Sequence, residues 1–477
     1  MLCITDDFNA VRFFGGAEGF QTFVNTLERL KADRIALDAA SPDLTNYPSA
    51  IGTHNPHQLA ADYFKEDPDP LATVVPGLKE SGHEVLANVR MNDHHGKPTQ
   101  WAEWEQAHVE WSLGVDTGAR DWKSIGKLRC MDYAIEEVRE HRLAILEEVL
   151  ESYPFDGLQL DFSRTPPFVS QPKGANGKHI TDYLRMVRQL LKTACKGEGL
   201  LTVILPWDLD LCRIEGLEVE RWVEEGLVDS ISPGEKYYAD WNLDFGPWLS
   251  LVEGTAIDLI PITPGNVSPY QDFENGEISL LGENTVMDLP KLRAIASNFL
   301  SQGVSHFGLY NFYTFDFGSI YAEVREAVDP EANRGKPKHF FFCRCPEYVY
   351  REYLAFDKGV TFRRHELMDP GETAEWRFRF TPDPESGVVD FRMAVKHLMP
   401  KDRLRVELNG EELDGLERNY EVVSRFGRRE IHTGFLGMGL PIERLAHGMN
   451  TLRVEVLERS EFREPLEVGE VELWSGR

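Results

Sequence analysis

Charged, amide and aromatic side chains gather where short apolar runs of this sequence end. The run DGLQLDF carries Asp161 near its end, and the run EVLANVRMND closes with Arg90, Asn92 and Asp93. Carboxylates and amides hydrogen-bond to paired hydroxyl groups, and aromatic faces stack on apolar ring surfaces. This mixture is typical of a site that binds sugars. The candidate site residues are Asp6, Asp7, Arg90, Asn92, Asp93, Asp161, Arg164, Trp207, Asp210, Glu235, Tyr237 and Asn311.

The elements that must position these residues are eight strand-like runs in residues 1–330, each followed by a segment of helical spacing. The runs span residues 3–7, 34–40, 84–91, 156–162, 200–207, 228–232, 257–263 and 306–312, and helical patterns cover 19–31, 133–152, 180–196, 219–226, 289–303 and 319–328. Eight alternations predict an α/β fold, a closed (β/α)8 TIM barrel. The alternative is a doubly wound open sheet, but Gly15-Gly16 form no G-x-G-x-x-G turn after the first run.

The barrel prediction also says which way the side chains point. Side chains of a barrel strand alternate between the lumen and the helix layer, and the active site lies at the C-terminal strand ends. In residues 156–162 the leucines share one parity, which leaves Gln159 and Asp161 for the lumen. In residues 84–92 the same alternation directs Asn88, Arg90 and Asn92 inward. Buried structural networks explain some such positions, but polar ends on two strands favour a site.

The sequence pattern changes after residues 329–338, whose Pro, Gly and charged composition is that of a linker. Segments such as 374–382 and 450–459 then alternate apolar and polar residues, and Asn409-Gly410 is a hairpin turn signal. A chain of 477 residues is also long for one core. We therefore predict a catalytic barrel over residues 1–330 and an accessory all-β domain, a β-sandwich or jelly roll, over residues 338–477.

Composition excludes several partner classes. The formal net charge is -28, and most of the acidic excess falls in residues 1–330, so nucleic acid and anionic membranes are disfavoured as partners. No run reaches the roughly 18 apolar residues of a membrane helix. The start, MLCITDDFNAVRFFGG, shows no secretory signal, which predicts a cytoplasmic protein, or a secreted or periplasmic one if a leader has been trimmed. Six cysteines are too sparse for a disulfide scaffold.

Three segments resemble a known family. The runs VRMNDHH, YAIEEVREHRLAILEEVLESYPFDGLQLDFSRTPPF and VERWVEEGLVDSISPGEKYY are similar to the bacterial family-10-like glycosylhydrolases, and residues 156–164 resemble that family's fourth strand. The resemblance covers most of residues 1–330 and implies a (β/α)8 barrel that acts on glycosidic bonds. The run LAHGMNTLRVEV, residues 445–456, looks like the galactose-binding-type jelly rolls appended to many glycosidases. No sugar-site residues carry over to it, so we expect a structural or interdomain role there.

Glycosidases of this kind use two carboxyl groups, one as nucleophile or base and one as general acid. Asp161 is our candidate nucleophile, since several glycosidase barrels place an aspartate at this strand end, and Arg90 or Arg164 nearby would keep it ionised. Its alternative role is to cap the following loop. Glu235 is our candidate general acid, with Pro233 and Tyr237 as an apolar wall that disfavours its charge. The alternatives for this role are Asp93, Asp208 and Asp210, or a solvated glutamate with no catalytic role. The strand positions favour retention of the anomeric configuration.

Other functions remain open at this point. His54 and His57, or His94 and His95 beside Asp93, could hold zinc or manganese in a sugar hydrolase or isomerase, although no H-E-x-x-H occurs. A Ser nucleophile has no G-x-S-x-G motif. A barrel without catalysis that only binds glycans is the non-enzyme alternative. The main prediction is a glycoside hydrolase that degrades an oligo- or polysaccharide with no metal and no cofactor.

Overall fold

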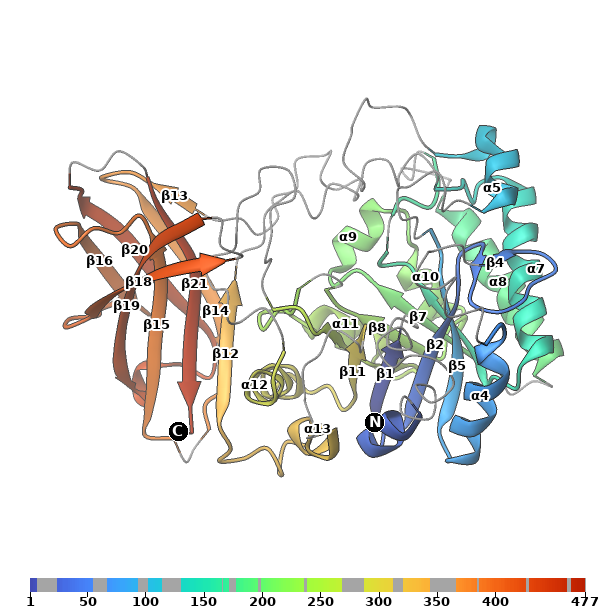
Figure 1. Cartoon of the computed structure of the whole chain (residues 1–477), viewed down its shortest axis with the longest axis horizontal. Coiled ribbons are helices and arrows are strands. Elements are labelled where there is room, and N and C mark those ends of the chain that lie inside the picture. The colour runs from blue at the N-terminus through green and yellow to red at the C-terminus, as the bar shows by residue number, and fades with distance from the viewer. Residues whose placement is uncertain are drawn as a thin grey trace.

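The computed structural model divides the chain between one large parallel sheet with helices and two antiparallel sheets (Figure 1). We call the first the α/β part, from β1 to α13, and the second the β part, from β12 to β21. The structure describes residues 1–6, 24–54, 67–92, 102–113, 130–164, 166–170, 177–195, 199–235, 238–267, 287–311, 321–343, 366–383, 386–425, 429–460 and 465–476. Among them, no helix is both long and apolar enough to cross a lipid bilayer.

Nine strands form the main path of the parallel sheet, in the order β10-β11-β1-β2-β5-β6-β7-β8-β9. Their positions agree closely with the eight runs expected from the sequence. The strands are β1 (Leu2–Asp6), β2 (Arg34–Ser41), β5 (Glu84–Arg90), β6 (Gly157–Asp161), β7 (Leu200–Leu205), β8 (Ser230–Pro233), β9 (Asp258–Leu259), β10 (Ile262–Pro264) and β11 (Phe307–Tyr310). Two short strands, β3 (Leu44–Thr45) and β4 (Thr53–His54), branch from β2.

The sequence predicted a closed barrel, but the structure shows a curled sheet whose hydrogen-bond ladder does not close. The two ends of the path are β9 and β10, which follow each other in the chain with Ile260 and Pro261 between them. Pro261 has no amide hydrogen and cannot donate to a ladder at the break. One isolated parallel bridge, between Gly234 and Ile262, joins the end of β8 to β10. The sheet therefore curls like a TIM barrel without a continuous closing ladder.

Hydrogen bonds across the inner face show how far the sheet curls. Gln159 Nε2 on β6 donates to Thr5 Oγ1 on β1 at 2.8 Å, and Arg34 NH1 on β2 donates to Ser230 Oγ on β8 at 3.0 Å. These strands are not neighbours in the sheet. The opposite side chains of β6, Leu158 and Leu160, lie in the apolar core. The alternation predicted for this strand is therefore confirmed.

Helices cover the outer face of the sheet, as Figure 1 shows for α4, α7 and α8. Helix α8 buries Ile180, Leu184, Val187 and Leu191, whose spacing places them on one face. Aspartate side chains cap the N-termini of α4, α9 and α12 by accepting from a backbone amide. The helices are α4 (Pro70–Glu80), α5 (Glu103–Ala107), α7 (Glu136–Ser152), α8 (Lys178–Ala194), α9 (Leu209–Ile214), α10 (Val219–Glu224), α11 (Gly246–Val252), α12 (Leu289–Leu300) and α13 (Tyr321–Ala327), with residues 24–30 also helical.

The β part contains a six-stranded and a four-stranded antiparallel sheet. The first has the order β12-β21-β15-β19-β18 with β13 on β21, and the second has the order β14-β20-β16-β17. The strands are β12 (Lys338–Cys343), β13 (Glu366–Met368), β14 (Thr373–Phe380), β15 (Val388–Lys396), β16 (Arg403–Leu408), β17 (Glu411–Glu412), β18 (Glu417–Arg425), β19 (Arg429–Pro441), β20 (Gly448–Glu458) and β21 (Leu466–Ser475). Asn409 and Gly410, both at positive φ, join β16 to β17, which confirms the predicted hairpin turn.

The apolar triplet at the start of the β part points in two directions. Phe340 contacts Phe380 with ring centroids 4.7 Å apart, and Phe342 contacts Phe378 at 5.0 Å, so these two rings join the two antiparallel sheets. Phe341, of the opposite parity, lies 6.2 Å from the ring of Trp241 in the α/β part. Successive side chains of β12 thus point to opposite faces. Phe340 and Phe342 pack between the two antiparallel sheets, and Phe341 contacts the α/β part.

Amide side chains fasten the α/β part to the edge strand β14. Asn242 donates to Arg377 O at 3.2 Å and accepts from the amide of Arg379 at 2.6 Å, so its side chain pairs with the free edge as a strand would. Asn298 of α12 donates to Arg379 O at 2.6 Å. Figure 1 shows α12 between the parallel sheet and β12.

The segment 329–338, a linker by composition, is anchored in the structure. Asn333 is buried, and its Nδ2 lies within hydrogen-bond distance of Arg293 O (2.9 Å), Ala327 O (3.0 Å) and Ser297 Oγ (3.1 Å). Three acceptors from two helices hold one side chain, so the connection between the parts is a packed turn.

Candidate active site

Asp161 lies at the C-terminal end of β6, on the inner face of the curled sheet and fully buried. Its Oδ1 accepts from the amide of Ser163 at 2.8 Å and from Ser163 Oγ at 2.7 Å. Its Oδ2 accepts from the hydroxyl of Tyr310 at 2.7 Å. One oxygen thus caps the loop after the strand, which was the alternative role expected for it, and the other is held from across the sheet by β11.

Tyr310 is the donor that orients Oδ2. Burial raises the pKa of its phenol well above the usual value, and the charge of Asp161 raises it further, while Arg164 and Arg90 oppose this. The phenol therefore stays protonated and donates a hydrogen bond to the carboxylate. The two arginines act electrostatically on the Tyr310 phenol.

Arg90 of β5 is the registered neighbour of Asp161 on β6. Its NH2 donates to Asn311 Oδ1 at 3.0 Å, and its Nε lies 3.9 Å from Asp38 Oδ1. Asn311 has a positive φ of 51°, a conformation that asparagine tolerates better than most residues. Two predicted site residues, Arg90 and Asn311, are thus brought together at the strand ends beside Asp161.

A second layer of polar side chains lies deeper in the lumen and supports the first. Asn88 donates to Asp38 Oδ1 at 2.9 Å and accepts from Gln159 at 3.1 Å, and Gln159 also donates to Thr5. Asp38 further accepts from Ser41 Oγ at 2.9 Å. A buried polar group destabilises the fold unless it is hydrogen-bonded. Here, side chains from β1, β2, β5 and β6 hydrogen-bond to one another. The network fixes the side chains on which the upper layer rests.

Glu235 follows β8 and is buried, with 1% of its surface exposed. The residue before it, Gly234, donates its amide to Leu205 O at 3.2 Å and forms the bridge to Ile262. A Cβ at Gly234 would come within 2.3 Å of the Ile262 side chain, so this close approach of β8 and β10 requires glycine. The glutamate therefore leaves the sheet at its C-terminal edge, the edge that also carries Asp161.

The structure places the remaining predicted residues in different roles. Asn92 is buried and bonds to the backbone of Met131 and Pro167, so it holds two loops together. Asp210 lies on α9, where its side chain is 82% exposed and paired with Arg213. Asp6 is buried at the end of β1, Arg164 is half-buried, and half-buried Trp207 accepts from Trp248 Nε1 through its carbonyl oxygen. Asp7, Asp93 and Tyr237 lie outside the described residues.

Two residues of the Asp161 environment were not in the predicted set. Ser163 carries no sequence signal beyond its position two residues after Asp161, the spacing at which a serine bonds back to an aspartate. Tyr310 ends the last strand-like run, so its position was visible, but its pairing with a strand 149 residues earlier was not.

Metal ligands do not gather in the described part of the chain. No three His, Cys, Asp or Glu side chains there come close enough to hold an ion. Of the histidines considered as ligands, His57, His94 and His95 lie outside the described residues. Burial lowers the pKa of His54, which lies on the short strand β4, joined to β2 through β3.

No protein-family model and no curated protein matches this sequence. Solved structures similar to the chain include alpha-L-fucosidase isoenzyme 2 from Paenibacillus thiaminolyticus, with a TM-score of 0.43, 12% identity and coverage of 69% of this chain and 48% of that one. This chain thus spans about half of the fucosidase.

Two further similar structures are a maltogenic alpha-amylase from Thermotoga neapolitana (TM-score 0.41, 10% identity, 96% and 99% coverage) and a GH36 alpha-galactosidase from Geobacillus stearothermophilus (0.38, 14%, 95% and 55%). These neighbours are glycoside hydrolases by name. Likeness at this level assigns neither a family nor an activity to this chain.

Proposed function

We propose that this protein is a glycoside hydrolase in which Asp161 is the nucleophile and Glu235 the general acid. The observation that carries the proposal is the carboxylate of Asp161, buried at the C-terminal strand ends and held by hydrogen bonds to both of its oxygens. An ionised carboxylate only accepts hydrogen bonds, and Ser163 and Tyr310 both donate to Asp161. A buried, oriented carboxylate is what nucleophilic attack on an anomeric carbon needs.

The geometry favours Oδ2 as the attacking atom. Oδ1 accepts two hydrogen bonds from Ser163, whereas Oδ2 accepts one from Tyr310 and so retains a lone pair for a new bond. As Oδ2 bonds to the anomeric carbon, Glu235 transfers its proton to the leaving oxygen and the glycosidic bond breaks. Water then attacks the anomeric carbon with Glu235 as base, releasing Asp161 and retaining the configuration.

The surroundings of Glu235 support its role as acid. Its burial disfavours the charged form of a carboxyl group, and the neighbouring segment, Ser230 to Pro233, is buried throughout. Because Asp161 and Glu235 are both buried, a sugar must displace the groups that cover them before it can react.

We assign six of the other candidates to substrate binding at the same edge of the sheet, leaving out Asn92 and Asp210, whose side chains have the other roles described above. Arg90 and Asn311 border Asp161, Asp6 ends β1, and Arg164 follows β6. Trp207 and Tyr237 are proposed as stacking surfaces for pyranose rings. Residues 1–330 would form the catalytic barrel and residues 338–477 a β-sandwich accessory domain, as in the family that the sequence resembles.

The test is a panel of aryl glycosides and oligosaccharides, with released sugar as the readout. With a substrate in hand, Asp161→Asn should lower kcat by at least about a thousandfold, because an amide is no nucleophile. Glu235→Gln should harm substrates with poor leaving groups most. Asp258→Asn is the matched control, since Asp258 begins β9 at the opposite edge of the sheet and should keep full activity. Full turnover by Asp161→Asn would refute the mechanism.

A crystal structure of the protein with a bound sugar tests retention directly. A separation of about 5 to 5.5 Å between the carboxyl groups of Asp161 and Glu235 fits retention, and about 6.5 to 9.5 Å fits inversion. Tight sugar binding at this edge without turnover of any glycoside would instead favour a glycan-binding barrel.

A further inference from the structure

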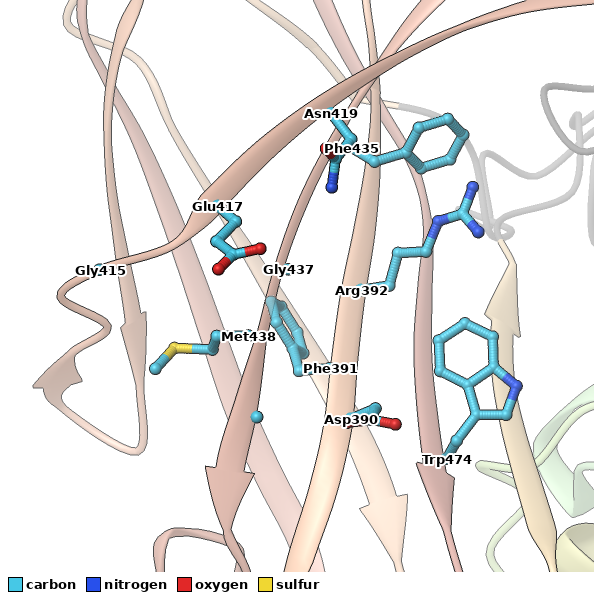
Figure 2. Close-up of a pocket in the computed structure, with 11 residues that line it drawn as sticks. Asp390, Phe391, Arg392, Gly415, Glu417, Asn419, Phe435, Gly437, Met438 and Trp474 are labelled. Atoms are coloured by element: carbon cyan, nitrogen blue, oxygen red, sulfur yellow. The ribbon is translucent and has the colours of Figure 1, made fainter. Parts of the chain in front are cut away.

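A polar groove lies on the β part, over the outer face of the six-stranded sheet. Its volume is about 580 Å³, and strands β15, β18, β19 and β21 contribute to it. Figure 2 shows Arg392 and Trp474 on the same side of the sheet. The groove belongs to the β part alone and contains none of the residues proposed for catalysis.

The strand register explains why these side chains meet. Asp390 pairs with Trp474 on one side and with Gly439 on the other, and Arg392 pairs in the same way with Gly437. Paired residues of neighbouring strands point to the same face. Because Gly437 and Gly439 have no side chains, β19 leaves a trough between the side chains of β15 and those of β18.

Trp474 forms a rigid wall of the groove. Its ring stacks on His339, with centroids 4.5 Å apart and an angle of 21° between the planes. His339 is itself held by Glu472, whose Oε2 lies 2.7 Å from Nε2. A ring fixed in this way by its neighbours provides a flat apolar surface with little loss of side-chain entropy when a ligand stacks on it.

The polar residues of the groove both donate and accept hydrogen bonds. Asp390 and Glu417 carry carboxylates, Asn419 an amide, and Arg392 a guanidinium that lies 3.7 Å from the ring centroid of Phe435. Planar groups beside an aromatic ring match a pyranose, whose hydroxyls donate and accept at its edge and whose C–H face is apolar.

The charge of the groove disfavours polyanionic ligands, and the pairing of its central strand disfavours an extended peptide there. Two carboxylates against one guanidinium make the lining acidic, so a polyanionic chain would be repelled. An extended peptide binds a sheet by pairing with a free edge, and β15, the strand under the groove, offers none because it is paired on both sides with β19 and β21. Of the strands that contribute to the groove, β18 lies at the end of the sheet.

We propose that this groove binds a neutral carbohydrate, at a site separate from the ends of the parallel strands. The sugar ring stacks on Trp474, and its hydroxyls bond to Asp390, Arg392, Glu417 and Asn419. The site goes beyond the proposed hydrolase activity and would bind its ligand even if that activity were absent.

The experiment is native gel electrophoresis of the full chain through gels that contain galactomannan, xyloglucan, starch or polygalacturonate. The protein carries Asp161→Asn, so that turnover cannot consume the polysaccharide. At least one neutral polysaccharide should retard it, and Trp474→Ala should weaken that binding by about tenfold or more. Tyr420→Ala is the matched control, because Tyr420 is 45% exposed on β18 but has the opposite parity to Asn419.

Asp390→Asn provides a second variant that keeps the ring and the shape of the groove. It should weaken retardation several-fold, and circular dichroism checks that each variant is folded. Retardation by polygalacturonate alone, no retardation by any of the three neutral polysaccharides, or equal retardation of both groove variants and the parent would overturn the proposal. Since turnover is not measured, a failure of the proposed hydrolase activity leaves this result unaffected.

Discussion

The two parts of this molecule differ in the side chains that face their interiors, which are polar in the parallel sheet and apolar between the two antiparallel sheets. In the α/β part, the inner face of the sheet carries Asn88, Gln159 and Asp161, all buried. Gln159 and Asp161 bond across the lumen to β1 and β11, and Asn88 bonds to the adjacent strands. In the β part, the facing rows of the two sheets are apolar, as in β14, where Trp376 and Phe378 are buried and alternate with exposed residues.

This difference follows from how each sheet is covered. The parallel sheet curls around its inner face, so any polar side chain there loses water and costs about 1 to 3 kcal/mol if it is left unpaired. An antiparallel sheet with one face in water can keep its polar side chains there without that cost. Stability alone therefore does not explain the polar side chains of the lumen. Polar side chains in the groove on the β part lose little stability, because they lie on a face that is open to water.

Removing a ring from the apolar interior of the β part should have the greatest effect on stability. Phe378→Ala removes a buried ring that contacts Phe342, and it should lower the free energy of unfolding by about 3 to 5 kcal/mol. Denaturant unfolding measures the change. Val388→Ala, at an exposed position of β15, should change stability by less than about 0.5 kcal/mol. Equal effects at the two positions would contradict the assignment of an interior.

The lumen gives a smaller effect of a different kind. Tyr310→Phe removes one hydrogen bond to a charged acceptor, a loss of about 1.5 to 3 kcal/mol, and should lower kcat/KM by roughly 10- to 100-fold. Tyr133→Phe is the control, because that buried hydroxyl donates to a backbone carbonyl, Met91 O, at 2.9 Å and also interacts with Arg142. It should reduce stability and spare activity. Loss of activity in both variants to the same degree would assign Tyr310 to packing.

A buried charged cluster in the α/β part should make the stability of the fold depend on pH. Arg142 pairs with Asp43 and with Glu105, and burial together with the charge of Asp43 raises the pKa of Glu105 from 4.5 to about 8 against the effect of Arg142. The folded protein thus holds a proton that the unfolded chain releases. This contribution to stability is complete below pH 4.5 and is lost as the pH rises through about 8.

Glu105→Gln should therefore flatten the dependence of stability on pH. The parent should lose about 1 kcal/mol per pH unit in this window from this group, and the amide should lose none. Thermal unfolding of both proteins between about pH 5 and 9 measures the slopes. Parallel slopes would show that Glu105 is ionised in the folded protein.

The local features of this fold were predicted from the sequence because they depend on near neighbours. The parity of β5 and β6 needs only the alternation of apolar and polar residues, and the Asn409-Gly410 turn needs only two residues that tolerate positive φ. The alternation of a strand and the residue types of a turn depend only on consecutive residues, so a single sequence is enough to find them.

Tertiary structure decided which distant groups meet. Composition alone made residues 329–338 a linker, yet Asn333 anchors that segment because helices α12 and α13 supply its acceptors. The strand count predicted a closed barrel, but the ladder breaks at Pro261. Asp210 and Asp161 looked alike as strand-end carboxylates, and only the fold turns the first to solvent and brings Tyr310 to the second. Such pairings depend on the curvature of the sheet and on loop paths, which no window of consecutive residues contains.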